Sequence, residues 1–167
     1  IGLYFARKPD VKPYKAVVLR GNFLLLPPGK SDIRIDGGVK LLEDVEVHSV
    51  MPHMHMLGRE IKVTMTPPGG EPEVLVGIGD WDYNWQETYF LKEPRKARKG
   101  TIFRVEAVYD NSAANPNNPF NPPQRVWFGE QTDMEMCFAF LGVPAHATPR
   151  RVQVEQLPIT VPRTKAD

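Results

Sequence analysis

The chain has 167 residues, of which 41% are hydrophobic and 25% charged, and its formal net charge is +1. A chain of this length can bury a substantial core, and the even charge balance gives no support for binding nucleic acid. No run of about 18 apolar residues is present, so no membrane-spanning helix is expected. We expect one domain over residues 1–167. Because the chain starts at Ile1 without an initiator methionine or a signal peptide, we also expect it to be part of a larger parent protein.

Short alternating runs rich in Val, Ile, Phe and Tyr, bounded by Gly, Pro and Asn, predict β-strands along the whole chain. The expected strands cover residues 15–26, 32–35, 45–56, 60–66, 73–78, 89–91, 101–109, 124–128, 134–141 and 152–157. Turns are expected at the dipeptides Pro28-Gly29, Gly37-Gly38, Gly69-Gly70 and Lys99-Gly100. With no amphipathic helix evident, the pattern predicts an all-β fold, an antiparallel β-sandwich that is jelly-roll-like.

Two histidines one residue apart, His53 and His55, lie in the run MPHMHMLGR at residues 51–59. Positions i and i+2 of a strand lie on one face, about 7 Å apart along the backbone, so two imidazoles in this arrangement can bind one metal ion. Imidazole suits several metals, whereas the thioether sulfur of methionine favours Cu(I). Because Met51, Met54 and Met56 lie in the same run, the pattern indicates copper before zinc. The alternative is a pair of hydrogen-bonded histidines near a sheet edge.

The direction in which the two histidines point depends on the phase of their strand. Val45 and Val47 occupy odd positions, as do both histidines, so an unbroken strand directs the imidazoles inward, toward the second sheet or the cleft at its edge. A shift of register near Pro52 or near the glycine that follows would change this phase.

A third metal ligand must come from another segment. The predicted strand at residues 134–141 places Met134 and Met136 on one face, and Glu135 and Cys137 on the other. Either methionine can supply a sulfur atom, and the spacing does not distinguish between them. The alternative is that both methionines fill gaps in the core, which is their usual role.

Several other polar and aromatic side chains are interpreted as structural. His48 lies at an even position and is expected to face away from His53, and His146 is expected in a surface turn. Glu135 could orient an imidazole through its free ring nitrogen, but its opposite phase argues against this role. An aromatic stretch is expected to pack at the core and its rim rather than to bind a sugar or peptide: Trp81, Tyr83, Trp85 and Tyr89.

Several other structural and functional features have no support in this sequence. The single cysteine, Cys137, excludes an intrachain disulfide. No G-x-S-x-G motif, phosphate-binding loop or Cys–His nucleophile pair is found, so hydrolase and nucleotide chemistry have no motif support.

Two motifs carry a family resemblance. The run PHMHMLGR at residues 52–59 resembles the H-x-H-x-L-G-[KR] signature of the copper type II, ascorbate-dependent monooxygenases. That family includes peptidylglycine alpha-hydroxylating monooxygenase and dopamine beta-monooxygenase. The run GEQTDMEMC at residues 129–137 resembles the second family signature, a turn leading to D-E-M-C. Their order and separation are similar to those of the C-terminal catalytic domain, and the segments at 82–85, 109–112 and 115–119 resemble its bacterial branch.

The resemblance implies a jelly-roll-like sandwich with one mononuclear copper ion, whose ligands would be His53, His55 and Met136. In the family this copper binds and activates dioxygen, which then abstracts hydrogen from a substrate carbon. The resemblance therefore implies a monooxygenase that acts on dioxygen and an unidentified small-molecule or peptide substrate. It also implies a periplasmic or secreted location.

The chain departs from the family pattern in two respects. The family's second copper is bound by three histidines in a separate N-terminal domain, whereas only His48 and His146 remain here. An electron-delivering domain is therefore expected elsewhere in the parent protein. Animal members pair the cysteine after the ligand methionine with a second cysteine, but Ala107 takes that position here and leaves Cys137 unpaired. A non-catalytic copper or electron-transfer module, and a metal-free interaction domain, are the competing functions.

Overall fold

The computed structural model describes residues 2, 5, 7, 13–22, 25–145 and 151–158 of the chain. These described residues form eleven β-strands and no helix. The strands are β1 (Tyr14–Arg20), β2 (Leu25–Leu26), β3 (Lys30–Leu41), β4 (Val45–His53), β5 (Gly58–Thr66), β6 (Glu73–Ile78), β7 (Tyr89–Ala97), β8 (Ile102–Asn111), β9 (Val126–Trp127), β10 (Phe138–Pro144) and β11 (Val154–Gln156). None of the described residues belongs to a helix that is long and apolar enough to cross a membrane.

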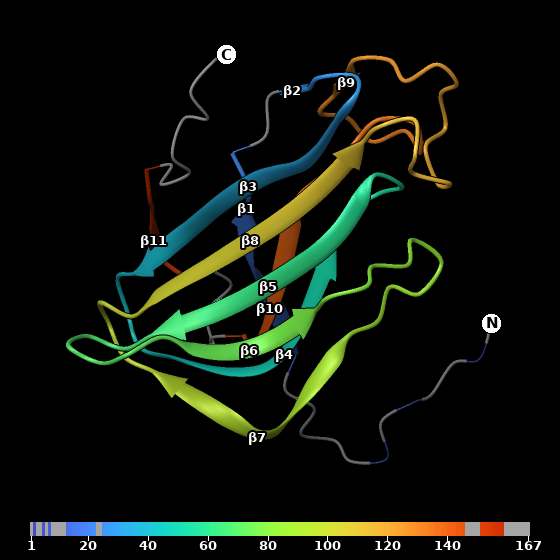
Figure 1. Ribbon diagram of the computed structural model, residues 1–167. Coiled ribbons are helices and arrows are strands. Elements are labelled where there is room, and N and C mark those ends of the chain that lie inside the picture. Colours follow the sequence, from blue (N-terminus) through green and yellow to red (C-terminus); the bar gives the residue numbers. More distant parts are fainter. Residues whose placement is uncertain are drawn as a thin grey trace.

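The strands form two main sheets that pack against each other. One sheet has the strand order β1-β10-β4-β7, the other has the order β11-β3-β8-β5-β6, and β2 pairs separately with β9. Figure 1 shows the five-stranded sheet in front of β1, β10 and β4. All these strand pairs are antiparallel, which confirms the predicted all-β antiparallel sandwich. The more specific jelly-roll topology stays a prediction.

The alternation of side chains along each strand creates the core. In β8, Phe103, Val105 and Tyr109 are fully buried, whereas Glu106 between them is exposed. In β10, Leu141 is likewise buried between half-buried neighbours. Because apolar burial stabilises by about 25 cal/mol per Å², the two inner faces hold the sheets together.

The dipeptide Gly37-Gly38 is part of β3, so the predicted turn at this point is wrong. The two glycines are buried where other segments of the chain approach closely. A Cβ atom on Gly37 would collide with the backbone of Arg20, and one on Gly38 would collide with the carbonyl oxygen of Phe103. These glycines therefore serve close backbone packing within a long strand.

Other strand boundaries differ where the chain leaves its sheet. The predicted strand at 45–56 ends at His53, and the predicted strand at 134–141 begins only at Phe138. The predicted strand at 15–26 is interrupted between β1 and β2, and residues 23 and 24 lie outside the described part of the chain. β7 is longer than predicted and extends to Ala97. The strand at 73–78 is confirmed.

The candidate site lies where the chain crosses from one sheet to the other. β4 belongs to the four-stranded sheet and β5 to the five-stranded sheet, so residues 54–57 pass from one layer to the other. β10 pairs with β4, and its first residue, Phe138, lies opposite His53. Both sequence motifs therefore meet at one end of the sandwich.

Candidate metal centre

His53 is the last residue of β4 and lies on the outer face of its sheet. The ladder between β4 and β7 is irregular between Val47 and Ser49, and the buried phase of β4 changes there. Beyond this point Val50 is fully buried, whereas His53 is half-buried opposite the half-buried Phe138. The inward direction predicted for an unbroken strand therefore does not apply to His53, because a register irregularity changes the face that each later position occupies.

His55 lies in the turn between β4 and β5 and is only 4% exposed. Its ring centroid is 5.1 Å from that of His53, and the two ring planes are inclined by 82°. The structure thus brings the two imidazoles together as the i, i+2 spacing predicted, although only one of them belongs to a strand. At this separation the two rings can approach one ion from different directions.

Each imidazole is oriented by an oxygen atom at its Nδ1. The Nδ1 of His53 lies 2.6 Å from Oε1 of Gln86, and the Gln86 amide donates its own hydrogen bond of 2.8 Å to the Tyr83 carbonyl. The Nδ1 of His55 lies 3.0 Å from the carbonyl oxygen of Met134. Because these oxygens only accept hydrogen bonds, both Nδ1 atoms carry the proton. The Nε2 atom of each ring keeps its lone pair for a metal ion.

The protonation state of His53 also suits metal binding. Burial lowers the pKa of His53 below its usual value, the hydrogen bond that its ring donates to Gln86 acts in the opposite direction, and the neighbouring His55 lowers the pKa further. His53 is therefore neutral at neutral pH, which is the form that ligates metals.

Met134 and Met136 take different environments. The thioether of Met134 packs against Gly129, since a Cβ atom on that glycine would collide with the sulfur. The main chain of Met134 is engaged as well, because its carbonyl oxygen binds the His55 ring. Met134 therefore contacts the His55 ring through its backbone carbonyl, while its thioether packs near Gly129.

Met136 is half-buried and precedes β10 by two residues. Phe138 pairs with His53. The backbone N–H group of Met136 donates to the same Glu135 oxygen that accepts from the backbone of His55. The side chain of Met136 has the same alternating phase as Phe138, as predicted. The choice of Met136 as the thioether donor stays a prediction.

Glu135 connects the two motifs from the inside. Its carboxylate is fully buried and accepts hydrogen bonds from the backbone N–H groups of His55 at 2.9 Å and Leu57 at 2.6 Å. Burial raises the pKa of Glu135 to about 7, and these backbone hydrogen bonds oppose that rise. The prediction that Glu135 lies on the face opposite Met136 is correct. The contact that sequence reasoning missed is to the main chain of the histidine segment rather than to an imidazole nitrogen.

Among the described residues, no three side chains of His, Cys, Asp or Glu gather closely enough to hold a metal ion. A metal centre formed by these residues therefore needs a donor of another type beside His53 and His55. A thioether meets this requirement, and two imidazoles with one thioether form a neutral donor set that suits copper.

Sequence comparison supports a role for copper in general. The profile of the copper type II ascorbate-dependent monooxygenase C-terminal domain matches residues 25–150. The chain belongs to this family. It is also 28% identical over 156 residues to human DBH-like monooxygenase protein 1, an alignment that covers 84% of this chain and 24% of that protein. The mouse and chicken proteins of the same name are each 25% identical over 156 residues, with the same coverage. The chain thus spans about a quarter of the length of these relatives.

The aromatic stretch of this monooxygenase domain divides into buried and exposed members. Trp81 is 5% exposed and donates a hydrogen bond of 3.1 Å from its indole nitrogen to the carbonyl oxygen of His55. The Tyr83 ring centroid lies 6.0 Å from that of His55. Trp85, in contrast, is 67% exposed. The predicted core and rim packing is confirmed for Trp81, which bonds to the main chain of His55, and for Tyr83, which lies edge-on to its ring.

Cys137 is a free, buried thiol, as predicted. Burial raises its pKa to about 12, an effect that a hydrogen bond from Tyr109 partly opposes. The thiol therefore stays protonated at neutral pH. A protonated thiol is a poor metal ligand and a poor nucleophile, so Cys137 acts as a small apolar side chain.

His48 does not join the pair. His48 has both ring nitrogens engaged, with Nδ1 at 2.8 Å from the Tyr14 hydroxyl and Nε2 at 2.7 Å from the Glu46 carboxylate. This arrangement agrees with its predicted structural role. His146 lies outside the described residues.

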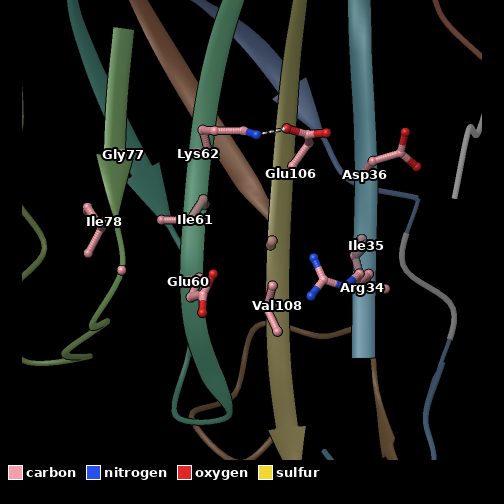
Figure 2. Close-up of a pocket in the computed structure, with 12 residues that line it drawn as sticks. Arg34, Ile35, Asp36, Glu60, Ile61, Lys62, Gly77, Ile78, Glu106 and Val108 are labelled. Atoms are coloured by element: carbon pink, nitrogen blue, oxygen red, sulfur yellow. Dashed lines mark ion pairs between the residues drawn. The ribbon is translucent and has the colours of Figure 1, made fainter. Parts of the chain in front are cut away.

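A cavity of about 400 Å³ lies on a different part of the monooxygenase domain. It is lined by β3, β5, β6 and β8 of the five-stranded sheet, and its walls include the paired charges of Lys62 and Glu106 (Figure 2). None of the predicted copper ligands lines this cavity.

Replacing Gln86 with leucine tests the orientation of His53. The substitution removes the oxygen that holds Nδ1, so we expect copper affinity to fall about 10-fold, within the range of about 10- to 100-fold for such outer partners. Titration against a competing chelator measures this change. Gln124→Leu, at an exposed position, is the matched control and should keep the original affinity. Equal affinity in the two variants would contradict the orienting role of Gln86.

Proposed function

We propose that this domain holds a single copper ion between His53, His55 and Met136, and that it is the oxygen-activating part of a monooxygenase. The observation that carries the proposal is the paired imidazoles, whose ring centroids are 5.1 Å apart and whose Nδ1 atoms both face oxygen acceptors. A mononuclear centre requires donor atoms that can reach one ion, and the lone pairs of the two Nε2 atoms at this end of the sandwich are such donors.

The donor set fits a copper ion that changes oxidation state. Both imidazoles are neutral donors, and a thioether adds no charge, so the ligands suit Cu(I) as well as Cu(II). Bound copper would supply the binding and activation of dioxygen. The half-buried position of His53 on the outer face leaves one side of the site accessible to a substrate.

The chain's own residues preorganise the site. Gln86 and the Met134 carbonyl keep each Nδ1 protonated, which prevents the rings from turning the wrong nitrogen toward the ion. Trp81 anchors the main chain of His55 and excludes water from its inner side. Such positioning reduces the reorganisation that a metal centre needs when it binds its substrates.

Monooxygenation also requires an electron donor and a substrate that is hydroxylated. Because the chain covers 24% of the length of its curated relatives, we infer that the parent protein carries an electron-delivering domain elsewhere. The substrate would be a small molecule or a peptide that is hydroxylated at carbon. We place the parent protein in the periplasm or outside the cell.

Copper analysis and oxygen uptake by the parent protein test the proposal. We expect about one copper ion per chain and oxygen consumption driven by ascorbate in the presence of substrate. Stoichiometric copper without oxygen consumption would favour a non-catalytic copper or electron-transfer module. Absence of specific copper binding would reject the metal centre altogether.

The choice of thioether is tested by Met136→Leu, with Met134→Leu as its matched control. Leucine preserves the approximate volume but removes the sulfur, so Met136→Leu should lose the sulfur scatterer from the X-ray absorption spectrum of the Cu(I) protein. It should also lose about 10-fold or more in Cu(I) affinity. Met134→Leu should keep both properties, and the reverse result would assign the sulfur to Met134.

A further inference from the structure

The chain that leaves β4 at His53 loses its regular ladder partners before β5 begins at Gly58. The backbone N–H groups of the intervening turn must therefore find other acceptors, since a buried N–H group without one is costly. Two of them, those of His55 and Leu57, donate to opposite oxygens of the Glu135 carboxylate at 2.9 and 2.6 Å. Glu135 is 80 residues from His55 along the chain.

The same carboxylate is bonded to the second ligand-bearing segment. The backbone N–H group of Met136 donates a hydrogen bond of 3.1 Å to Oε2 of Glu135, the oxygen that also accepts from His55. One carboxylate oxygen is thus shared by the main chains of two proposed ligands, His55 and Met136. Glu135 is 0% exposed, so water does not compete for these donors.

We propose that Glu135 is a positioning residue that fixes the main chains of His55 and Met136 relative to each other before copper binds. This inference rests on the proposed function and adds a role for a residue that does not itself ligate the metal. The Met134 carbonyl and the Trp81 indole bind the same histidine at its ring and its carbonyl oxygen. Glu135 is distinguished from both because one of its carboxylate oxygens accepts from the backbone N–H groups of His55 and of Met136.

The chemistry of the carboxylate explains why glutamate suits this position. Its two oxygens accept three N–H groups, whereas the amide of a glutamine offers one acceptor oxygen and one donor group. Glutamine has nearly the same size, so it fills the space but directs its own N–H₂ group at a backbone N–H group. Glu135→Gln is therefore expected to separate the two segments without opening a cavity.

Copper affinity of the folded Glu135→Gln variant is the main test. We expect a loss of about 10- to 100-fold, with weakened sulfur scattering in the Cu(I) X-ray absorption spectrum. Asp36→Asn is the matched control: Asp36 is 6% exposed, pairs with Arg104 in the five-stranded sheet, and loses its charge in the same way. Its copper affinity should change less than about 3-fold. Unchanged affinity and spectrum in Glu135→Gln would overturn the proposal.

Amide hydrogen exchange in the wild-type domain provides a second test that needs no variant. If Glu135 fixes the turn before copper binds, the amides of His55 and Leu57 should exchange at least about 100-fold more slowly than unstructured amides in the copper-free protein. Exchange of both at unprotected rates until copper is added would overturn the positioning role. Wild-type protein that shows this protection but binds no copper would instead reject the proposed function.

Discussion

Replacing His55 with alanine should reduce copper affinity by more than about 100-fold, which exceeds the effect expected for residues that only orient a ligand. The physical reason is that the ring supplies one of two imidazole nitrogens, and the described part of the chain offers no third His, Cys, Asp or Glu to replace it. Equilibrium dialysis or chelator competition at neutral pH measures the loss. Oxygen consumption by the parent protein should disappear with it.

The same substitution should also lower the free energy of unfolding of the copper-free domain. The lost hydrogen bond joins the His55 ring to the Met134 carbonyl, and an unsatisfied buried carbonyl costs about 1–3 kcal/mol. His48→Ala is the control for histidine removal, because both of its ring nitrogens bond to Tyr14 and Glu46. It should keep full copper affinity. A domain in which His48→Ala and His55→Ala lose copper equally would not have the centre proposed here.

Replacing Trp81 with alanine should destabilise the domain by about 3–5 kcal/mol, because a large buried side chain is removed. The indole also donates to the His55 carbonyl oxygen, and it packs where a Cβ atom on Gly58 would meet its ring at 3.0 Å. For a domain of this size, the loss corresponds to a fall of about 10 °C in the unfolding midpoint. Thermal or denaturant unfolding followed by circular dichroism measures it.

Trp85→Ala is the matched control for this large effect. Trp85 lies four residues away in the same loop but is 67% exposed, so its removal should change stability by no more than about 0.5 kcal/mol. Equal destabilisation by the two substitutions would mean that burial at Trp81 does not support the turn that carries His55.

The organisation of the site explains why one end of a sandwich can present a metal centre. The segments that carry the proposed ligands are the crossing between the two sheets and the residues just before β10, and they are joined by hydrogen bonds rather than by a regular ladder. Side chains beyond the end of a strand no longer follow the alternating pattern of faces. His55 can therefore be buried while His53 stays accessible. The rigid sheets behind them limit how far either imidazole can move.

Local patterns in the sequence predicted the strands, the antiparallel sandwich and the copper family. The period-2 alternation of β8 and β10 depends only on which side chains are apolar, and such alternation can be read directly from the residues. The same rule correctly placed Met136 and Glu135 on opposite faces. The pairing of His53 with His55 followed from their spacing alone, whereas their role as copper ligands stays a prediction.

Only the tertiary structure decided which way each imidazole points and what holds it. The ladder irregularity after Val47 depends on pairing with β7, and no local signal in β4 reveals it. Gln86 lies 33 residues from His53, and Glu135 lies 80 residues from His55, so these contacts exist only after the sheets have assembled. Side-chain periodicity is a property of neighbouring residues, but register and hydrogen bonding between distant segments depend on the packing of the whole sandwich.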